Sequence, residues 1–259
     1  MATLRLSGNP DADALLSKDP LALLIGMVLD QQVPLEWAFA GPAELRRRLG
    51  HDLDAQELAA LDPEALASLF SARPALHRYP ASMAARVQEL CRLLVDSYGG
   101  RADGVWKDVT SGPELFERVR RLPGFGEQKA KIFVALLGKQ LSVSPPGWQQ
   151  VSAPYGEPDT HRSVADITDQ DSLDLVRSFK QDMKAKNKAA AAETPAPEKT
   201  AAAKKTGAAK KTGAAKKTGA AKKTGAAKKT GAAKKTAGTA KKTAGTAVAK
   251  RPAARTAAR

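Results

Sequence analysis

Apolar residues recur at helical spacing through most of residues 1–183, whereas the strict alternation of a half-buried β-strand is scarce there. Aspartate, serine or proline precedes several of these segments and glycine follows some of them, as is typical of helix starts and ends. The segment over 35–49 contains Gly41-Pro42, where we expect the helix to be interrupted or to end. The pattern predicts an all-α fold with helices over 20–29, 35–49, 63–70, 80–98, 114–121, 127–141 and 172–184.

A glycine-rich turn separates two of the predicted helices. Residues 122–131 read LPGFGEQKAK, in which Pro123 restricts one φ and two glycines permit positive φ on either side of Phe125. The first amides of the following helix have no helical partner, and the helix dipole places positive charge there. A phosphate can bind at such a turn without any base being read. The spacing predicts a helix-hairpin-helix that clamps phosphate, with an ordinary turn between helices as the other interpretation.

The positive charge of the chain is concentrated in its C-terminal part. From residue 184 onward there are 22 Lys/Arg and 2 Asp/Glu, which leaves 20 basic and 25 acidic residues in 1–183. Large apolar residues are almost absent from residues 184–259, so this part of the chain cannot bury a core. Evenly spaced cations suit a polyanion, which favours nucleic acid over a solubilising tail or a membrane surface. Lys-Lys pairs recur every six residues, beginning at Lys204, Lys210, Lys216, Lys222, Lys228 and Lys234.

The remaining composition narrows the class of protein. We expect a helical domain over 1–183, a linker over 184–200 and a disordered Lys/Ala/Thr/Gly repeat tail over 201–259. Cys91 is the only cysteine, which excludes an internal disulfide and a cysteine-held zinc site or iron–sulfur cluster, and we expect it to be a buried structural thiol. His51 and His77 have no partners at metal-ligand spacing, and His161 is considered together with Asp159, so we predict no metal and no cofactor.

Segments that would direct the chain into or across a membrane are missing from the sequence. No run of about 18 apolar residues occurs, and the N-terminus lacks a basic region followed by an apolar stretch. We therefore expect a cytoplasmic protein that, in a bacterium, is associated with the nucleoid.

Three segments of the chain are similar to parts of one known family and occur in its order. Residues 23–32, LLIGMVLDQQ, resemble an early helix of the family that ends in glutamines. Residues 76–100 resemble its long middle helix, which ends at a glycine, and residues 122–131 resemble its hairpin. Across most of residues 15–165 the chain resembles the helix-hairpin-helix (HhH-GPD) DNA glycosylases of the endonuclease III superfamily. The resemblance implies a helical glycosylase fold that binds double-stranded DNA and no membrane, and we expect a monomer. The tail resembles the lysine-rich tails of linker histones.

The resemblance also implies a catalytic carboxylate. The family has an aspartate beyond the hairpin, often in Val-Asp-Thr-His, and this chain has Asp-Thr-His beginning at Asp159, after Pro158. Such a carboxylate stabilises positive charge on the deoxyribose and activates water. The interval of 35 residues from Gly124 to Asp159 exceeds the family pattern by roughly a dozen. The excess lies in residues 142–158, which are rich in proline, glycine and serine and are predicted to form a loop. An N-cap of a helix is the other interpretation of Asp159.

The remaining roles follow from positions that match the family. Gln32 matches the residue that fills the gap when a base leaves the stack, with Gln31 as the neighbouring candidate and a polar helix end as the other interpretation. Bifunctional members have a lysine nucleophile where this chain has Gln128, and an amide cannot form a Schiff base, so no lyase activity is implied by this route. The hairpin residues expected to bind DNA are Gly124, Phe125, Gly126, Gln128, Lys129 and Lys131.

These patterns lead to two hypotheses for function. The first is a monofunctional DNA glycosylase of base excision repair, which hydrolyses a damaged or mispaired base from DNA while the tail holds the acidic domain on the duplex. The alternative is a non-catalytic, nucleoid-associated DNA-binding protein with a degenerate glycosylase site. The long interval before Asp159 and the short segment after it favour this alternative.

Trp148 and Tyr155 either stack on a flipped base or pack over the core.

Overall fold

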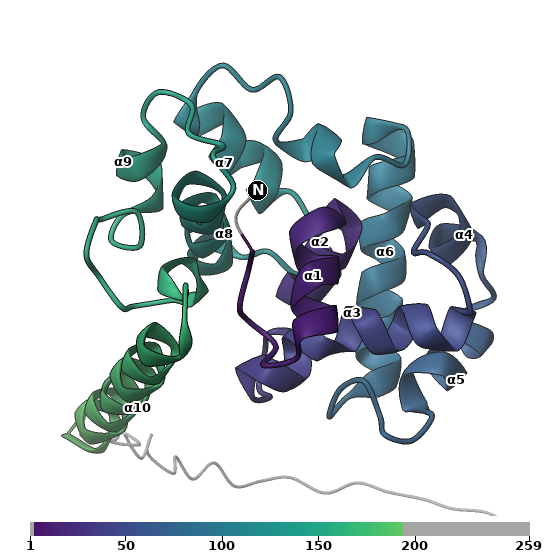
Figure 1. Ribbon diagram of the computed structural model, residues 1–259, viewed down its shortest axis with the longest axis horizontal. Helices are drawn as coiled ribbons and strands as arrows, with labels where there is room; N and C mark the ends of the chain where they lie inside the picture. Colours follow the sequence, from purple (N-terminus) through teal and green to yellow (C-terminus); the bar gives the residue numbers. More distant parts are fainter. Residues whose placement is uncertain (1–2, 194–259) are drawn as a thin grey trace, which may run out of the picture. The chain divides into compact units, whose positions relative to one another are not determined.

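The computed structural model describes residues 3–193, and every regular element in this range is helical (Figure 1). The predicted all-α fold is therefore confirmed for this part of the chain. The tail expected over 201–259 and the last part of the linker lie outside the described residues. The elements are α1 Pro10–Lys18, α2 Pro20–Leu29, α3 Leu35–Leu49, α4 Ala55–Ala60, α5 Pro63–Ser71, α6 Pro80–Tyr98, η1 Ala102–Val105, α7 Gly112–Arg120, α8 Glu127–Gln140, α9 Trp148–Ser152, η2 Val164–Asp166 and α10 Gln170–Glu193.

Local capping explains why several helices begin and end where they do. The side chains of Asp19, Asp62 and Ser111 accept hydrogen bonds from first-turn amides of α2, α5 and α7, and a proline lies in the first turn of each. Helix α6 ends at Gly99, whose φ of 61° is left-handed. The ranges predicted for α2, α5, α6, α7 and α8 are confirmed to within two residues.

Helix α3 differs from the prediction, because it continues through Pro42 as one helix of 15 residues. The expected interruption near Gly41-Pro42 is therefore wrong. Both residues are buried, and a Cβ on Gly41 would lie 2.6 Å from Leu29 Cδ1. Close packing of α3 against α2 thus offsets the hydrogen bond that proline cannot donate.

The structure also contains helices that the sequence pattern did not predict. Helices α1 and α4 are short, and α9 interrupts the loop expected over 142–158. Helix α9 begins at Trp148, whose ring lies 2.5 Å from where a Cβ on Gly138 would be, so contact with α8 stabilises it. Helix α10 passes the boundary expected at residue 183 and reaches Glu193, because its Ala- and Lys-rich continuation favours helix.

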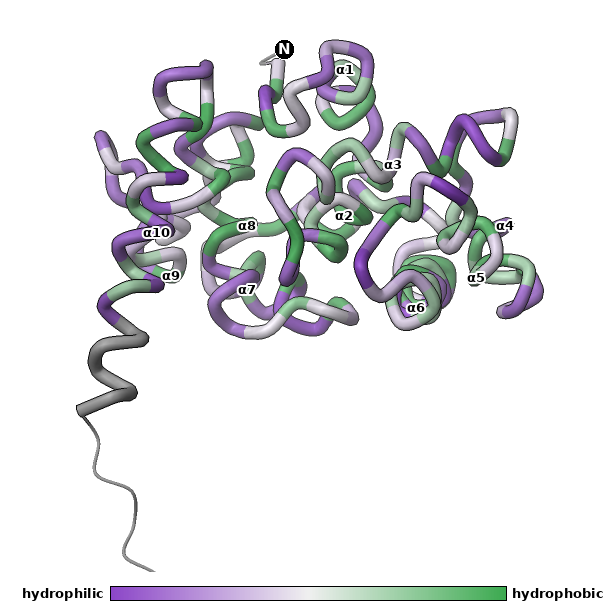
Figure 2. Tube along the Cα trace, turned by 90° about the horizontal axis from the view of Figure 1, so that it is seen from below, coloured by the Kyte–Doolittle hydropathy of each residue, from purple (hydrophilic) through white to green (hydrophobic). Residues whose placement is uncertain are grey.

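The apolar core is built around α2. Every residue from Leu21 to Leu29 is buried, and α2 packs on α3 and contacts α6 and η1. Helix α8 packs on α7, α9 and η2, while α4 and α5 cover α6 (Figure 1). Figure 2 shows apolar stretches of α2 and α8 in the middle of the domain. Cys91 is buried as expected, and burial raises the pKa of its thiol to about 12.

Candidate DNA-binding and active site

The hairpin turn between α7 and α8 uses its two glycines differently. Gly124 has a φ of 84°, and a Cβ there would lie 2.9 Å from Arg86 Cδ, so both conformation and space require glycine. Gly126 has an ordinary φ of −73° and is the N-cap of α8, where no side chain accepts from the first amides. A Cβ on Gly126 would meet no atom within 4 Å. Of the two glycines that permit positive φ beside Phe125, only Gly124 adopts it.

Phe125 anchors the hairpin from the inside. Its side chain is buried and meets Phe133 edge to face, with ring centroids 5.6 Å apart. Its amide donates to the carbonyl of Leu122 at 3.0 Å. Phe125, expected from the sequence to bind DNA, thus presents neither its ring nor its amide outward.

The two lysines of the hairpin have different surroundings. Lys131 is paired with Glu127 of the same helix at 2.9 Å. Lys129 Nζ instead donates to the carbonyl of Met27 at 2.5 Å and approaches that of Val28 at 3.5 Å. The ammonium expected to contact phosphate is therefore directed inward, toward the end of α2.

Burial changes the titration of Lys129. Desolvation lowers the pKa of its ammonium to about 8, and Arg86 adds to this lowering, while Asp30 opposes it. A shifted pKa of this kind, in a cluster of charged groups, is typical of functional sites.

The two candidate glutamines are separated by the structure. Gln31 is turned inward, since its Nε2 donates to the Val28 carbonyl at 2.7 Å and its Oε1 accepts from Arg86 Nη1 at 2.8 Å. His77 Nε2 donates to the backbone carbonyl of Gln31 at 2.8 Å, because His77 Nδ1 accepts from the Tyr79 amide. Gln32 is exposed and has a φ of 57°.

These contacts bring three elements to one place, which we call the α2 junction: the end of α2 with Gln31, the hairpin residue Lys129, and Arg86 and His77 beside them. The sequence indicated the glutamines and the hairpin, but it did not single out Arg86 or His77 as site residues. Arg86 is one of several charged residues along α6 and has no distinguishing local signal, and only the packing of α6 against the hairpin reveals its position.

Asp159 lies in the loop between α9 and η2. It is exposed, has a φ of 52°, and makes no hydrogen bond or ion pair within residues 3–193. The N-cap of η2 is Ser163, so the interpretation of Asp159 as a helix cap is wrong for the described residues. Four residues before it, Tyr155 Oη accepts from Gln128 Nε2 at 2.9 Å in the first turn of α8.

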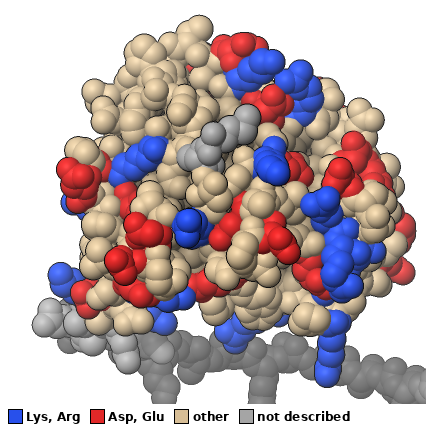
Figure 3. All heavy atoms as spheres, in the orientation of Figure 1, with Lys and Arg blue, Asp and Glu red and all other residues tan. Residues whose placement is uncertain are grey.

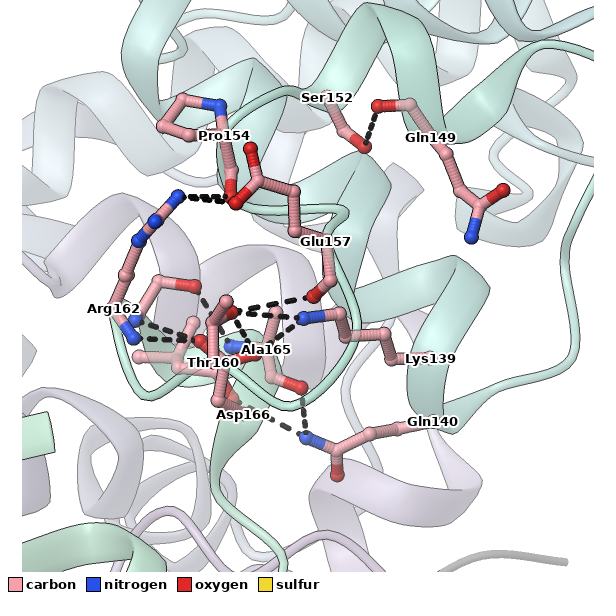
Figure 4. Close-up of polar contacts among 12 residues, drawn as sticks. Lys139, Gln140, Gln149, Ser152, Pro154, Glu157, Thr160, Arg162, Ala165 and Asp166 are labelled. Carbon is pink, nitrogen blue, oxygen red and sulfur yellow. Dashed lines mark hydrogen bonds and ion pairs between the residues drawn. The ribbon is translucent and has the colours of Figure 1, made fainter. Parts of the chain in front are cut away.

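Polar contacts secure the loop on the other side of Asp159 (Figure 4). Thr160 Oγ1 lies 3.4 Å from Lys139 Nζ in the last turn of α8, and Lys139 pairs with Asp166 at 2.5 Å. The Asp166 carboxylate is buried and accepts from the amides of Arg162 and Ser163. The loop therefore contacts both ends of α8, and no hydrogen bond or ion pair joins Asp159 itself to the hairpin or to Gln32.

Charge on the domain surface is mixed. On the face drawn in Figure 3, lysines and arginines alternate with acidic side chains and form no continuous basic surface. In the described part of the chain no three histidine, cysteine, aspartate or glutamate side chains lie close enough together to hold a metal ion. None of the described helices has the length and apolar character needed to cross a bilayer.

Comparison with known families agrees with the hairpin geometry. Residues 25–198 match the family model described as "HhH-GPD superfamily base excision DNA repair protein". The chain belongs to this superfamily. The match includes the α2 junction, the hairpin and the Asp159 loop, and it covers more than half of the sequence. Among curated proteins no sequence matches the chain.

Membership places the protein among base excision repair proteins that bind DNA and are generally DNA glycosylases. Trp148 packs against α8 at Gly138, so its ring covers part of the apolar core. Tyr155 is half-buried and holds the Gln128 amide.

Proposed function

We propose that the protein is a DNA glycosylase that hydrolyses the N-glycosidic bond of a damaged or mispaired base in double-stranded DNA. The observation that carries the proposal is a direct bond between the helix of the hairpin and the last turn of α2, the helix that precedes Gln31 and Gln32. Lys129, the third residue of α8, donates to the carbonyl of Met27 at 2.5 Å. A backbone clamp and a wedge in fixed relation are what extrusion of a base requires.

Gln32 is the wedge in this proposal. Its side chain is exposed, whereas that of Gln31 is occupied by Val28 and Arg86. A left-handed φ is uncommon for glutamine, and such residues gather at functional sites. A flat amide can enter the gap in the stack and hydrogen-bond to the unpaired base.

Asp159 is the proposed catalytic carboxylate. Its exposed side chain has no protein partner among the described residues, so it is free to face the deoxyribose. Bond cleavage builds positive charge on the sugar, which a carboxylate stabilises, and the same group can orient or deprotonate water.

Hydrolysis without strand cleavage follows from the groups at the start of α8. Gln128 has no amine, and its amide is held by Tyr155. The Lys129 ammonium is committed to the end of α2. Neither residue offers a free amine to attack the sugar, so the proposed enzyme is monofunctional.

The alternative is a DNA-binding protein of this fold without catalytic activity. One observation favours it: Thr160, next to Asp159, is bound to Lys139 in the last turn of α8, while the hairpin precedes the first turn. A carboxylate near the far end of α8 would be too distant from the clamped strand to act.

Base release decides between the two. The full chain is incubated with duplexes that carry a panel of lesions and mismatches, and hot alkali then reveals abasic sites. We expect release from at least one lesion and a loss of about 100-fold or more in Asp159→Asn. Asp108→Asn is the matched control, since Asp108 is also exposed with a φ of 57°. Release from no lesion, or release unchanged in Asp159→Asn, would favour the alternative or remove Asp159 from the mechanism.

A further inference from the structure

The last carbonyls of α2 have an unusual set of partners. Helix ends leave several carbonyls without helical donors. Here the Gly26 carbonyl accepts from the Asp30 amide, and the Leu29 carbonyl accepts from the Gln31 amide. The Val28 carbonyl accepts from the Gln31 side chain. The Met27 carbonyl has none of these local donors, and the group that binds it comes from a distant part of the chain and also approaches the Val28 carbonyl at 3.5 Å.

That group is the ammonium of Lys129, 102 residues away in sequence and 2.5 Å from the Met27 oxygen. A cation at a helix C-terminus interacts favourably with the helix dipole. The same ammonium lies 5.9 Å from the centroid of the Phe125 ring. Lys129 therefore caps α2 from the hairpin, and its position is set by the hairpin.

This cap is costly to the folded state. Folding removes the ammonium from water, whereas an apolar side chain at this position would have no charge to desolvate. The lowered pKa of Lys129 reflects this unfavourable desolvation free energy. A buried charge that opposes folding stability beside the candidate site points to a role in function.

The turn that contains Gln31 and Gln32 follows the capped end of α2. Because α2 is buried from Leu21 to Leu29, it cannot shift without disturbing the core. Its end is held by Lys129, and the turn that follows is held at Gln31 by His77 and Arg86. Gln32 follows Gln31 directly and is exposed.

We propose that Lys129 is a positioning residue for base extrusion: by capping α2 from the hairpin, it fixes Gln32 relative to the gripped DNA backbone. The proposal rests on the proposed function, because it takes Gln32 as the wedge. The substrate it concerns is a base still paired in duplex DNA, since an unpaired base needs no wedge.

The test measures extrusion directly, without requiring base release. Duplexes containing 2-aminopurine in a mismatch become fluorescent when the base leaves the stack. The full chain is compared with Lys129→Met, Lys129→Arg, Gln32→Ala and the double variant Gln32→Ala with Lys129→Met, all at saturating protein. We expect the extruded population to fall about tenfold in Lys129→Met and in Gln32→Ala, because extrusion costs a few kcal/mol without a wedge.

The double-variant cycle shows whether Lys129 acts through Gln32. The proposal expects Lys129→Met to have no further effect once Gln32 is alanine, and Lys129→Arg, which keeps a cationic donor, to lie nearer the wild type. Affinity for a fully paired duplex, which the hairpin binds by its backbone without a base leaving the stack, should stay within about twofold in Lys129→Met and Lys129→Arg. Additive losses, or an affinity loss equal to the extrusion loss, would show that Lys129 only maintains the fold and would overturn the proposal.

Failure of the inference can be told apart from failure of the proposed function. Base release from lesions in single-stranded DNA needs no extrusion, so wild type and Lys129→Met should release such bases equally. If the wild type releases no base, but Lys129→Met lowers extrusion only when Gln32 is present, the glycosylase proposal fails and the positioning role stands. If the wild type gives no fluorescence change with any duplex, the positioning role is overturned.

Discussion

At the scale of single residues, the hairpin glycines illustrate two different requirements. Gly124 is needed by the protein itself, because its left-handed φ and the nearby Arg86 leave no place for a side chain. Gly126 is exposed, and a Cβ there would meet no atom within 4 Å, so the fold itself does not require glycine at this position. We propose that glycine is present there because a DNA phosphate approaches the start of α8.

A pair of alanine variants separates these requirements. Gly124→Ala is expected to lower the free energy of unfolding by about 1–3 kcal/mol, from strain and the contact with Arg86. Gly126→Ala is expected to cost below about 1 kcal/mol and to weaken binding to undamaged duplex by about tenfold, because its methyl group would meet the phosphate. Urea unfolding and fluorescence anisotropy measure the two effects. Equal DNA affinity in Gly126→Ala and wild type would show that backbone does not approach this glycine.

Lys129 makes a residue-scale prediction about pH. Its pKa is about 8 in the folded protein and near the ordinary lysine value of 10.5 when unfolded. Below pH 8 both states hold the proton and the folded state bears the cost of burial. Between pH 8 and 10.5 the unfolded state binds more protons, so this residue makes the free energy of unfolding rise with pH, by at most about 3 kcal/mol.

Urea unfolding at pH 7 and at pH 9.5 measures this contribution. Wild type should gain stability relative to Lys129→Met over this interval, since other titrating groups are common to both proteins. The charged groups that face the ammonium are Asp30 and Arg86, and both are present in wild type and in Lys129→Met. A parallel pH dependence in the two proteins would mean that Lys129 is not buried as described.

At the scale of elements, the loop between α9 and η2 owes its conformation to polar contacts. Lys139 of α8 and Asp166 of η2 form an ion pair in which the carboxylate is only 2% exposed. The Arg162 guanidinium binds Glu157 at 2.7 Å and the Pro154 carbonyl at 3.0 Å, which closes the loop on its outer side (Figure 4). The backbone around Asp159 is thus held from both sides.

Removal of the inner contact should unfold or loosen this loop. Lys139→Met leaves the Asp166 charge buried without a cation, and we expect a loss of about 3 kcal/mol in the free energy of unfolding. Arg101→Met is the control, because its ion pair with Asp103 is exposed and should contribute below about 1 kcal/mol. Chemical denaturation measures both, and similar small losses would show that the Lys139–Asp166 pair is not effectively buried.

At the scale of the whole molecule, the described domain and the lysine-rich part carry opposite charge. Residues 194–259 contain 19 Lys/Arg and one Asp/Glu, whereas acidic residues outnumber basic ones in the rest. The mixed surface in Figure 3 offers phosphate little general attraction on that face. The lysine repeat therefore remains our proposed source of non-specific DNA affinity.

Truncation after Glu193 tests this division and keeps α10 whole. We expect the shortened chain to bind undamaged duplex at least about tenfold more weakly at low salt and to show a much shallower dependence of log affinity on log salt. Titrations between 50 and 200 mM salt, roughly the range over which counterion release is measured, provide the slopes. An unchanged slope would contradict a DNA-binding role for the repeat.

Local signals were sufficient for most of the fold. Caps and glycine stops predicted α2, α5, α6, α7 and α8 because they act within one turn of the chain. They failed at Pro42, where packing on α2 keeps α3 continuous, and at Trp148, where contact with α8 stabilises a short helix. A local pattern contains no information about a neighbour that is distant in sequence.

The same division applies to the candidate site. The sequence by itself determined the helical class, the hairpin with its glycines, and the family-like order of glutamines, hairpin and Asp-Thr-His. Only the tertiary structure decided that Gln31 and Lys129 turn inward and that Arg86 and His77 lie beside them. It also decided that Asp159 lies on a loop that is held by contacts with α8 but makes no hydrogen bond to the hairpin. The physical reason is that the direction of a side chain depends on the desolvation and hydrogen bonds it finds across the fold, which its own segment does not specify.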